Sequence, residues 1–179
     1  MNFTVEKTSF TDALLIIPRV FLDPRGFFME IYQEAAFMEI GIADHFVQDN
    51  HSHSARNVLR GMHFQSPPHE TVKLVRCISG EIFDVLVDLR PNSPTFKKWE
   101  GFVLSGENKK MLYVPVGFAH GFYVTGEAAD VVYKVTDYYY KECDAGFRWN
   151  DPEIGIRWPG MQPIISEKDS NLPLFKEIL

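Results

Sequence analysis

The sequence contains few cysteines and no long hydrophobic segment. Only two of its 179 residues are cysteines. Cys77 lies in an apolar run and Cys143 in a polar stretch, and their spacing fits neither a metal site nor a redox motif, so we expect two reduced thiols. Every apolar run ends well before the roughly 20 residues that a membrane-spanning helix needs. The sequence therefore predicts neither a disulfide-linked protein nor a membrane protein.

Basic residues are also scarce, and the N-terminus carries no recognisable signal. The chain has 18 Lys and Arg against 24 Asp and Glu, a net charge of -6. Nucleic acid is not an expected partner, because backbone phosphates require a broad basic surface. Residues 1–7 lack the basic stretch and apolar core of a secretory signal, which predicts a cytoplasmic protein. A phosphorylated ligand would be held locally, by basic residues near the motifs described below: Arg25, Arg60, Lys73 and Lys168.

Short apolar or alternating segments between Gly and Pro residues predict one mostly β domain over residues 1–179. In the clearest segment, 82–89, Phe83, Val85, Val87 and Leu89 share one face and both aspartates, Asp84 and Asp88, lie on the other, the pattern of a half-buried strand. So many short strands in a chain of this length predict a sandwich or jelly roll. The other expected strands are 14–17, 27–32, 46–50, 58–64, 72–78, 102–104, 111–114, 122–125 and 131–136.

Helical signals are confined to two short segments. Residues 33–40 have a helical pattern and are followed by Gly41, a suitable C-terminal cap. The second signal is the tail from Ser166 onward. In Ser166-Glu167-Lys168-Asp169 the spacing is that of a capping box, with Ser166 as N-cap, and that role alone could explain Asp169. With so little helix, a parallel α/β sheet is disfavoured.

Polar residues on two strands suggest a cavity. In segment 46–50, alternation places Gln48 and Asn50 on the same side, which suggests amides that face a polar cavity, although an exposed edge would give the same pattern. In segment 27–32 the same counting aligns Phe28, Glu30 and Tyr32. This stripe could line a sugar or base pocket, and ordinary strand amphipathicity would also produce it.

The segment Arg60-Gly61-Met62-His63-Phe64-Gln65 brings a guanidinium, a histidine and an amide together in an apolar stretch. Strict alternation puts Arg60 and His63 on opposite faces, so if both serve one site, Gly61 must host a bulge or bend. Taken alone, a histidine such as His63 is more often a hydrogen-bonded core residue than a catalyst. Clustered histidines also suggest a metal in small β-barrels. No second histidine lies two residues after His63, so we take the His-X-His motif of a metal site to be absent and predict no metal. The presence of His69 and His120 still leaves a metal site possible.

Two further side chains are candidates for chemistry. His120 lies between small residues and glycines, which permit close approach of the backbone to a ligand, or simply form a turn. Tyr133 lies among β-branched residues, and a buried phenol usually needs a hydrogen-bond partner, whether in the core or in a site.

Together and in order along nearly the whole chain, these motifs resemble the dTDP-4-dehydrorhamnose 3,5-epimerase family. The resemblance implies a cupin-like jelly-roll β-barrel with short peripheral helices, in which the C-terminal segment from about residue 166 completes the active site. It also implies a homodimer that needs no cofactor or metal. The matching segments are DPRGFFME (23–30), FVQDNHS (46–52), LRGMHFQ (59–65), KLVR (73–76), FDV (83–85), VDLR (87–90), SPTF (93–96), GFAHGF (117–122), WNDP (149–152) and SEKD (166–169).

The resemblance implies an isomerase of dTDP-L-rhamnose biosynthesis, which converts dTDP-4-dehydro-6-deoxy-D-glucose to dTDP-4-dehydro-L-rhamnose. Hydrogens on C3 and C5 are acidic because the C4 ketone delocalises the resulting charge as an enolate. By the resemblance, His63 is the base and Asp169 its partner. Lys73 stabilises the enolate, and Tyr133 returns a proton to the opposite face.

The resemblance also assigns residues to substrate binding, and this chain departs from the family pattern at two places. Thr71-Val72 replaces the usual Gln-Gly before Lys73, after an unusual Ser66-Pro67-Pro68-His69-Glu70, and Tyr113 replaces the usual Trp. These departures leave a single-centre 3- or 5-epimerase of a related nucleotide keto-sugar as an alternative. A metal-dependent cupin enzyme is the less favoured alternative. The residues assigned to the nucleotide-sugar are Arg25, Glu30, Gln48, Asn50, Arg60, His120 and Lys168, with Phe28 and Tyr138 as candidates for stacking on the thymine.

Overall fold

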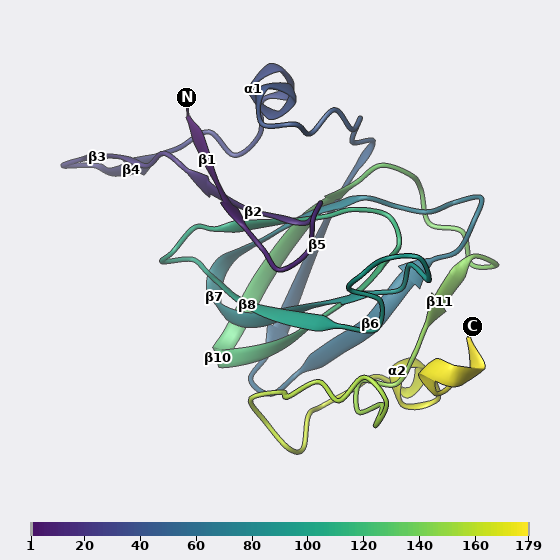
Figure 1. Cartoon of the computed structure of the whole chain (residues 1–179). Coiled ribbons are helices and arrows are strands. Elements are labelled where there is room, and N and C mark those ends of the chain that lie inside the picture. Colours follow the sequence, from purple (N-terminus) through teal and green to yellow (C-terminus); the bar gives the residue numbers. More distant parts are fainter. Residues whose placement is uncertain (1, 179) are drawn as a thin grey trace.

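The protein, for which we have a computed structural model that describes residues 2–178, is built mainly from β-strands (Figure 1). Its three helices are short. Among the described residues, no helix is long and apolar enough to cross a membrane. The elements in chain order are β1 (Phe3–Lys7), β2 (Leu14–Pro18), β3 (Phe21–Asp23), β4 (Gly26–Phe28), α1 (Glu34–Glu39), β5 (Gln48–Ala55), β6 (Leu59–Gln65), β7 (Lys73–Asp88), β8 (Trp99–Ser105), β9 (Met111–Val114), β10 (Phe118–Val135), β11 (Asp144–Gly146), α2 (Glu167–Ser170) and the 3-10 helix η1 (Phe175–Glu177).

Two long antiparallel strands, β7 and β10, organise the fold. The first half of β7 and the second half of β10 pair with each other and are flanked by β9 and β5. The remaining halves are flanked by β8 and β6. The pairing order β1-β2-β9-β7-β10-β6-β11 does not return on itself within residues 2–178. The predicted all-β class is therefore confirmed, whereas the predicted barrel is not seen as a closed ring of paired strands.

The expected strands are mostly present, but several are longer than predicted. Segments 72–78 and 82–89 join into β7, and segments 122–125 and 131–136 join into β10. The expected helices are both present, and Gly41 follows α1 with a φ of +90°, which a side chain at that position would disfavour. The two cysteines are free and buried in the described structure.

The predicted strand 27–32 is wrong beyond Phe28. Strand β4 pairs only with the three-residue β3, so this hairpin ends where its partner ends. The chain then turns toward the body of the protein, where the ring of Tyr32 packs edge-on against Phe37 and Phe46, with centroid distances of 4.9 and 5.5 Å. The predicted stripe of Phe28, Glu30 and Tyr32 on one strand face is therefore not formed.

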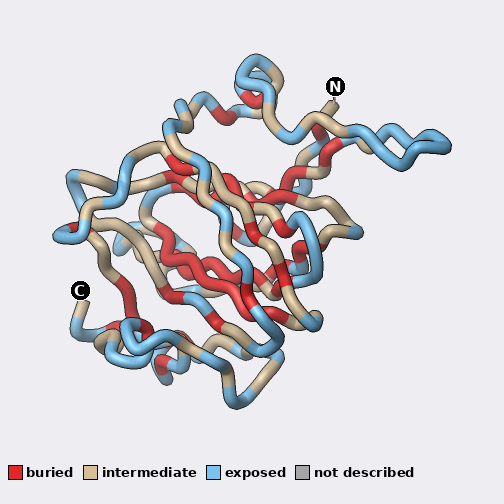
Figure 2. Tube along the Cα trace, turned by 180° about the vertical axis from the view of Figure 1, so that it is seen from behind, coloured by how far each residue is buried: buried red, intermediate tan, exposed pale blue. Residues whose placement is uncertain are grey.

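The prediction of a half-buried strand at 82–89 is also wrong, because side chains on both faces of this part of β7 are buried. Figure 2 shows that buried residues are concentrated in the central strands. One face packs between the two halves of the sheet. The other packs against Phe147 and Phe175 of the C-terminal segment. As a result, Asp84 and Asp88 are both 0% exposed. Asp88 is compensated by Arg90, whose Nη2 lies 2.9 Å from its Oδ2.

Candidate active site

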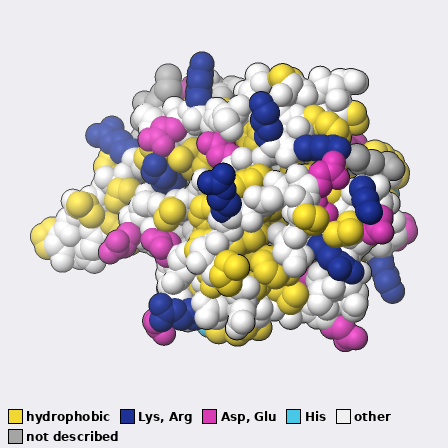
Figure 3. Space-filling view, turned by 60° about the horizontal axis from the view of Figure 1, so that its bottom comes forward, with side chains coloured by type: hydrophobic (Ala, Val, Ile, Leu, Met, Phe, Trp, Pro, Cys, Tyr) yellow, Lys and Arg dark blue, Asp and Glu magenta, His cyan; other side chains and the backbone are white. Residues whose placement is uncertain are grey.

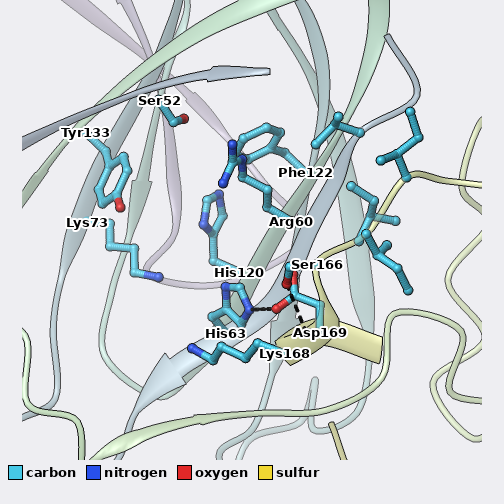
Figure 4. A pocket seen from close by; sticks show the side chains of 14 residues that line it. Ser52, Arg60, His63, Lys73, His120, Phe122, Tyr133, Ser166, Lys168 and Asp169 are labelled. Atoms are coloured by element: carbon cyan, nitrogen blue, oxygen red, sulfur yellow. Dashed lines mark hydrogen bonds and ion pairs between the residues drawn. The ribbon is translucent and has the colours of Figure 1, made fainter. Parts of the chain in front are cut away.

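Two adjoining hollows open between the strands and helix α2. Figure 4 shows the side chains that line the first of them. The first hollow has a volume of about 520 Å³ and the second about 320 Å³. They share four lining side chains from three strands and one helix: His63 of β6, Lys73 of β7, Tyr133 of β10 and Lys168 of α2. The two hollows therefore form one continuous cavity whose centre carries titratable groups.

A β-bulge brings Arg60 and His63 to the same cavity, as the sequence predicted. His120 of β10 pairs with His63, but Phe122, two residues on, pairs with Arg60, three residues back, so the register shifts by one. Gly61 lies inside this irregular stretch with a φ of +139°. A Cβ on Gly61 would lie 2.6 Å from the Cα of Gly121, so glycine is required both by conformation and by space.

His63 is held by Asp169 from the start of helix α2. The Nε2 atom of His63 lies 2.7 Å from Oδ1 of Asp169, which is only 2% exposed. Burial opposes ionisation of this carboxyl, but hydrogen bonds from His63 and from the backbone N–H of Gly61 outweigh it and lower the pKa of Asp169. The ionised carboxylate accepts the Nε2–H, which leaves Nδ1 of His63 as the ring nitrogen that can take a proton.

The predicted N-cap at Ser166 is confirmed, but the reciprocal half of a capping box is not formed, because the carboxylate of Asp169 bonds to His63 and to the backbone N–H of Gly61. The backbone N–H of Asp169 donates to Oγ of Ser166 over 3.0 Å, while its side chain turns toward the cavity. The short helix α2 thus fixes the carboxylate that orients His63.

Tyr133 and Lys73 approach the cavity from the side opposite His63 and Asp169 (Figure 4). Burial lowers the pKa of Lys73 from 10.5 to about 8, against the opposing effect of the carboxylates of Asp84 and Asp144. Burial raises the pKa of Tyr133 above its usual 10, so its phenol is protonated at neutral pH. The cavity therefore holds a basic imidazole on one wall and a phenolic acid with an ammonium group on the other.

His120 also lines the cavity and has its own buried carboxylate. Its Nε2 lies 2.5 Å from Oδ1 of Asp84. Asp84 was expected on an exposed face and was not recognised from the sequence as part of a site. The signal was present, since a carboxylate inside an apolar strand is rarely tolerated without a partner.

Four of the predicted binding residues lie where the sequence placed them. Gln48 and Asn50 point together into the second hollow, with Nε2 of Gln48 donating to Oδ1 of Asn50 over 2.8 Å, so they are not an exposed edge. Tyr138 lines the same hollow. Lys168 lines both hollows and forms an ion pair with Asp144. The lining of the second hollow also includes polar residues that were not predicted as site residues, namely Gln65, Thr71, Asp137, Tyr139 and Asp144.

Arg25, Phe28 and Glu30 line neither hollow. The β3–β4 hairpin projects from the body of the protein with hydrophobic side chains on its surface (Figure 3). Arg25 at its turn pairs with Asp23 at 2.6 Å, and its side chain is 89% exposed. Glu30 accepts a hydrogen bond from Nδ2 of Asn2. Arg25, Phe28 and Glu30 therefore do not lie at the cavity of their own chain, because the β3–β4 hairpin, which ends at Phe28, projects away from it.

The other departure from the family pattern, Tyr113, also lies outside the cavity. Its hydroxyl donates to Oδ2 of Asp44 over 2.6 Å. Burial, together with this hydrogen bond, raises its pKa. Tyr113 packs beneath α1, so this substitution belongs to the packing of the N-terminal segment.

Residues 2–178 contain no group of three or more His, Cys, Asp or Glu side chains suited to hold a metal ion. The sequence argument was wrong on one point, because His-X-His spacing does occur at His51-Ser52-His53. Both of these imidazoles turn to the outer side of β5, where each bonds to Oδ1 of Asp130 at 2.9 and 3.1 Å. Neither lines the cavity, so this pair does not supply a metal site there.

A histidine–aspartate pair that faces a tyrosine and a lysine across a sugar-sized cavity is the site of an acid–base isomerase. The similarity of this chain to known proteins agrees with this class. A family model described as dTDP-4-dehydrorhamnose 3,5-epimerase matches residues 7–177. The chain belongs to this family.

Individual relatives cover nearly the whole chain. The dTDP-4-dehydrorhamnose 3,5-epimerase of Salmonella typhimurium is 51% identical over 98% of this chain and 97% of its own length. A crystal structure of the Legionella pneumophila dTDP-6-deoxy-D-glucose-3,5-epimerase with dTDP-4-keto-L-rhamnose is 45% identical, with a TM-score of 0.95, over 99% of this chain and 95% of that chain. A 3'-monoepimerase from Streptomyces bikiniensis in complex with dTDP-quinovose is 30% identical, with a TM-score of 0.87, over 93% and 85%.

Proposed function

We propose that this protein converts dTDP-4-dehydro-6-deoxy-D-glucose to dTDP-4-dehydro-L-rhamnose by proton transfer at C3 and C5. The observation that carries the proposal is the placement of His63 with Asp169 on one wall of the cavity and Tyr133 on the other. Inversion of a carbon requires a base on one face and an acid on the opposite face, and this arrangement supplies both. The relatives that share this fold at about half identity carry the same activity in their names.

The reaction assigns one task to each group. Nδ1 of His63 removes the proton beside the ketone, and Asp169 stabilises the imidazolium that forms. The ammonium of Lys73 hydrogen-bonds the oxygen at C4 as negative charge develops there. Tyr133, whose raised pKa keeps it protonated, gives a proton to the other face and so completes the inversion. No residue in this scheme requires a metal or redox cofactor.

The nucleotide part of the substrate occupies the second hollow in this proposal. Gln48 and Asn50 offer amides, and Tyr138 offers an aromatic face for the thymine. Arg60, His120 and Lys168 surround the shared region and suit the diphosphate and sugar oxygens. The C-terminal segment from about residue 166 then completes the site through helix α2.

We further propose that the protein is a cytoplasmic homodimer with a cupin-like jelly-roll fold. The hairpin of β3 and β4 supports the dimer, since Leu22 is 81% and Phe28 66% exposed and such apolar side chains, when grouped on a projecting segment, are usually covered by a partner. In a dimer, the hairpin of one subunit would extend over the partner. Arg25, Phe28 and Glu30 would then reach the partner's cavity, which reconciles their assignment to substrate with their distance from the cavity of their own chain.

A single-centre epimerase is the second candidate. Thr71, one of the residues that departs from the family pattern, lines the second hollow, so the pocket itself has changed in this chain. The similar 3'-monoepimerase from Streptomyces bikiniensis shows that this fold also supports inversion of one centre. The number of inverted centres in the product separates the two candidates.

The variant His63→Ala tests the proposed function. It should lower kcat by about 10²–10⁴-fold, the usual contribution of a general base. The melting temperature should fall only modestly, because Asp169 loses one hydrogen-bond donor but keeps the backbone N–H of Gly61, and the ring of His63 is partly exposed in the cavity. His53→Ala is the control, because His53 makes a similar histidine–aspartate contact outside the cavity. Activity retained by His63→Ala would refute the assignment of the base.

A further inference from the structure

Two loops beside the second hollow are tied together by an unusual set of contacts. We call residues 66–70, which follow β6, the proline loop, and residues 137–140, which follow β10, the tyrosine segment. The tyrosine segment supplies Asp137, Tyr138 and Tyr139 to the lining of the second hollow. The proline loop lies behind it and is one of the places where this chain departs from the family pattern.

The rings of Tyr138 and Tyr139, which the tyrosine segment contributes to the hollow, have little core packing to hold them. Tyr138 is 56% exposed and Tyr139 62% exposed. An exposed ring keeps a defined position only if its backbone is fixed, and binding to a mobile wall loses affinity because the wall must be ordered first. The Tyr139 hydroxyl donates to Oδ2 of Asp144 over 2.9 Å. Apart from this bond, the position of both rings depends on what holds the backbone of residues 137–140.

Gln65, at the end of β6, fixes that backbone through three hydrogen bonds. Its Nε2 donates to the carbonyl oxygens of His69 and Tyr138 over 2.8 and 3.0 Å. Its Oε1 accepts from the backbone N–H of Tyr140 over 2.8 Å. One side chain thus joins the proline loop to both ends of the tripeptide 138–140.

His69 adds the second tie, and it does so with its side chain. Its Nδ1 lies 2.8 Å from Oδ2 of Asp137, and its ring stacks on Tyr140 with a centroid distance of 3.4 Å and an interplanar angle of 14°. The other carboxylate oxygen of Asp137 accepts the backbone N–H of Tyr138 over 2.7 Å. His69 therefore acts on both sides of Tyr138 and Tyr139 without lining the hollow itself.

We propose that His69 is a positioning residue that holds the tyrosine segment in place as the wall of the second hollow and thereby sets the affinity for the nucleotide part of the substrate. The proposal rests on the proposed function, because it takes the second hollow as the nucleotide site. It assigns a role to the proline loop, whose His69 contacts the tyrosine segment through Asp137 and Tyr140.

The experiment compares the full-length protein with His69→Ala in two measurements. The dissociation constant of dTDP, obtained by calorimetry, should rise about tenfold, and KM for the keto-sugar nucleotide should rise by a similar factor, as expected when a preorganised wall is loosened. The value of kcat at saturating substrate should stay within about twofold, since the reacting groups lie elsewhere. His53→Ala is the matched control and should change none of these quantities.

Two conservative variants separate the contacts and guard against misfolding. His69→Phe keeps a ring for stacking on Tyr140 but cannot bond Asp137, and His69→Asn keeps a polar group near Asp137 but loses the ring. Each should recover part of the affinity that His69→Ala loses.

Unchanged dTDP affinity in the folded variants would overturn the proposal, because a residue with a merely structural role would lower the melting temperature without changing affinity. A lower kcat with an unchanged KM would also overturn it, because His69 would then act on the reaction and not on binding. Failure of the proposed function would look different: the wild-type protein would bind dTDP without turning over the keto-sugar.

Discussion

Replacement of Asp169 by Asn should lower kcat strongly, although the two side chains have nearly the same shape. In the wild-type protein the two carboxylate oxygens accept two donors, Nε2–H of His63 and the backbone N–H of Gly61. An amide has one acceptor and one donor, so it cannot satisfy both. If its oxygen faces Gly61, its NH₂ faces His63 and forces the proton onto Nδ1, which disables the base.

The structure sets the size of the effect. Mispairing one buried donor costs about 1–3 kcal/mol of stability, which the protein should survive. Loss of the correct tautomer removes most of the contribution of a general base, about 10²–10⁴-fold in kcat. Because the pKa of Asp169 is lowered in the folded protein, its charge stabilises the fold above the unfolded pKa of about 3.9 and this contribution disappears as pH falls through the folded value. The Asn variant should lack that part of the acid dependence.

The assay is kcat for the keto-sugar nucleotide, measured beside urea unfolding of the same samples at neutral and acidic pH. Glu167→Gln is the control, because it makes the same chemical change at an exposed position of the same helix. If Asp169→Asn retains kcat within about tenfold of wild type while losing stability, Asp169 is only a structural element of the α2 terminus and the proposed pair is wrong.

Three further predictions follow from the cavity. Tyr133→Phe should retain exchange of the substrate proton with solvent better than net epimerisation, as followed by NMR in D₂O, because it removes the acid and leaves the base; equal loss of both would contradict its role. The pKa of Lys73 is about 8, so kcat/KM should fall as pH rises above about 8. The variant Lys73→Arg stays protonated, so an active Lys73→Arg enzyme should not show this alkaline decrease. If the decrease is unchanged in that variant, another group causes it. Gly61→Ala should cost at least about 2 kcal/mol in denaturant unfolding because a Cβ would meet the Cα of Gly121 at 2.6 Å, and a stable, active variant would refute the need for the bulge.

The chemistry of the site was predictable from the sequence because it depends on local motifs. The conflict between strand alternation and a shared site for Arg60 and His63 predicted a bulge at Gly61, and the register shift confirms it. The capping box likewise predicted the position of α2, although its spacing alone did not reveal that the side chain of Asp169 turns toward His63.

What the sequence could not supply was the environment of each strand face. Alternation in β7 separates two faces but does not say what packs on them, so Asp84 was expected in solvent and is buried against His120. The position of Arg25 depends on where the β3–β4 hairpin ends and projects, which residue periodicity does not encode. The ties between the proline loop and the tyrosine segment join residues about 70 positions apart, beyond any local pattern.

The most direct test of the proposed reaction is deuterium incorporation. The wild-type protein is incubated in D₂O with dTDP-4-dehydro-6-deoxy-D-glucose, and the product is examined by NMR and mass spectrometry. Each inversion passes through an enolate whose new proton comes ultimately from solvent, so the product should carry deuterium at both C3 and C5 in the configuration of dTDP-4-dehydro-L-rhamnose. A label at one carbon alone would identify a single-centre epimerase, and absence of label at both carbons, with dTDP binding intact, would contradict the proposed function.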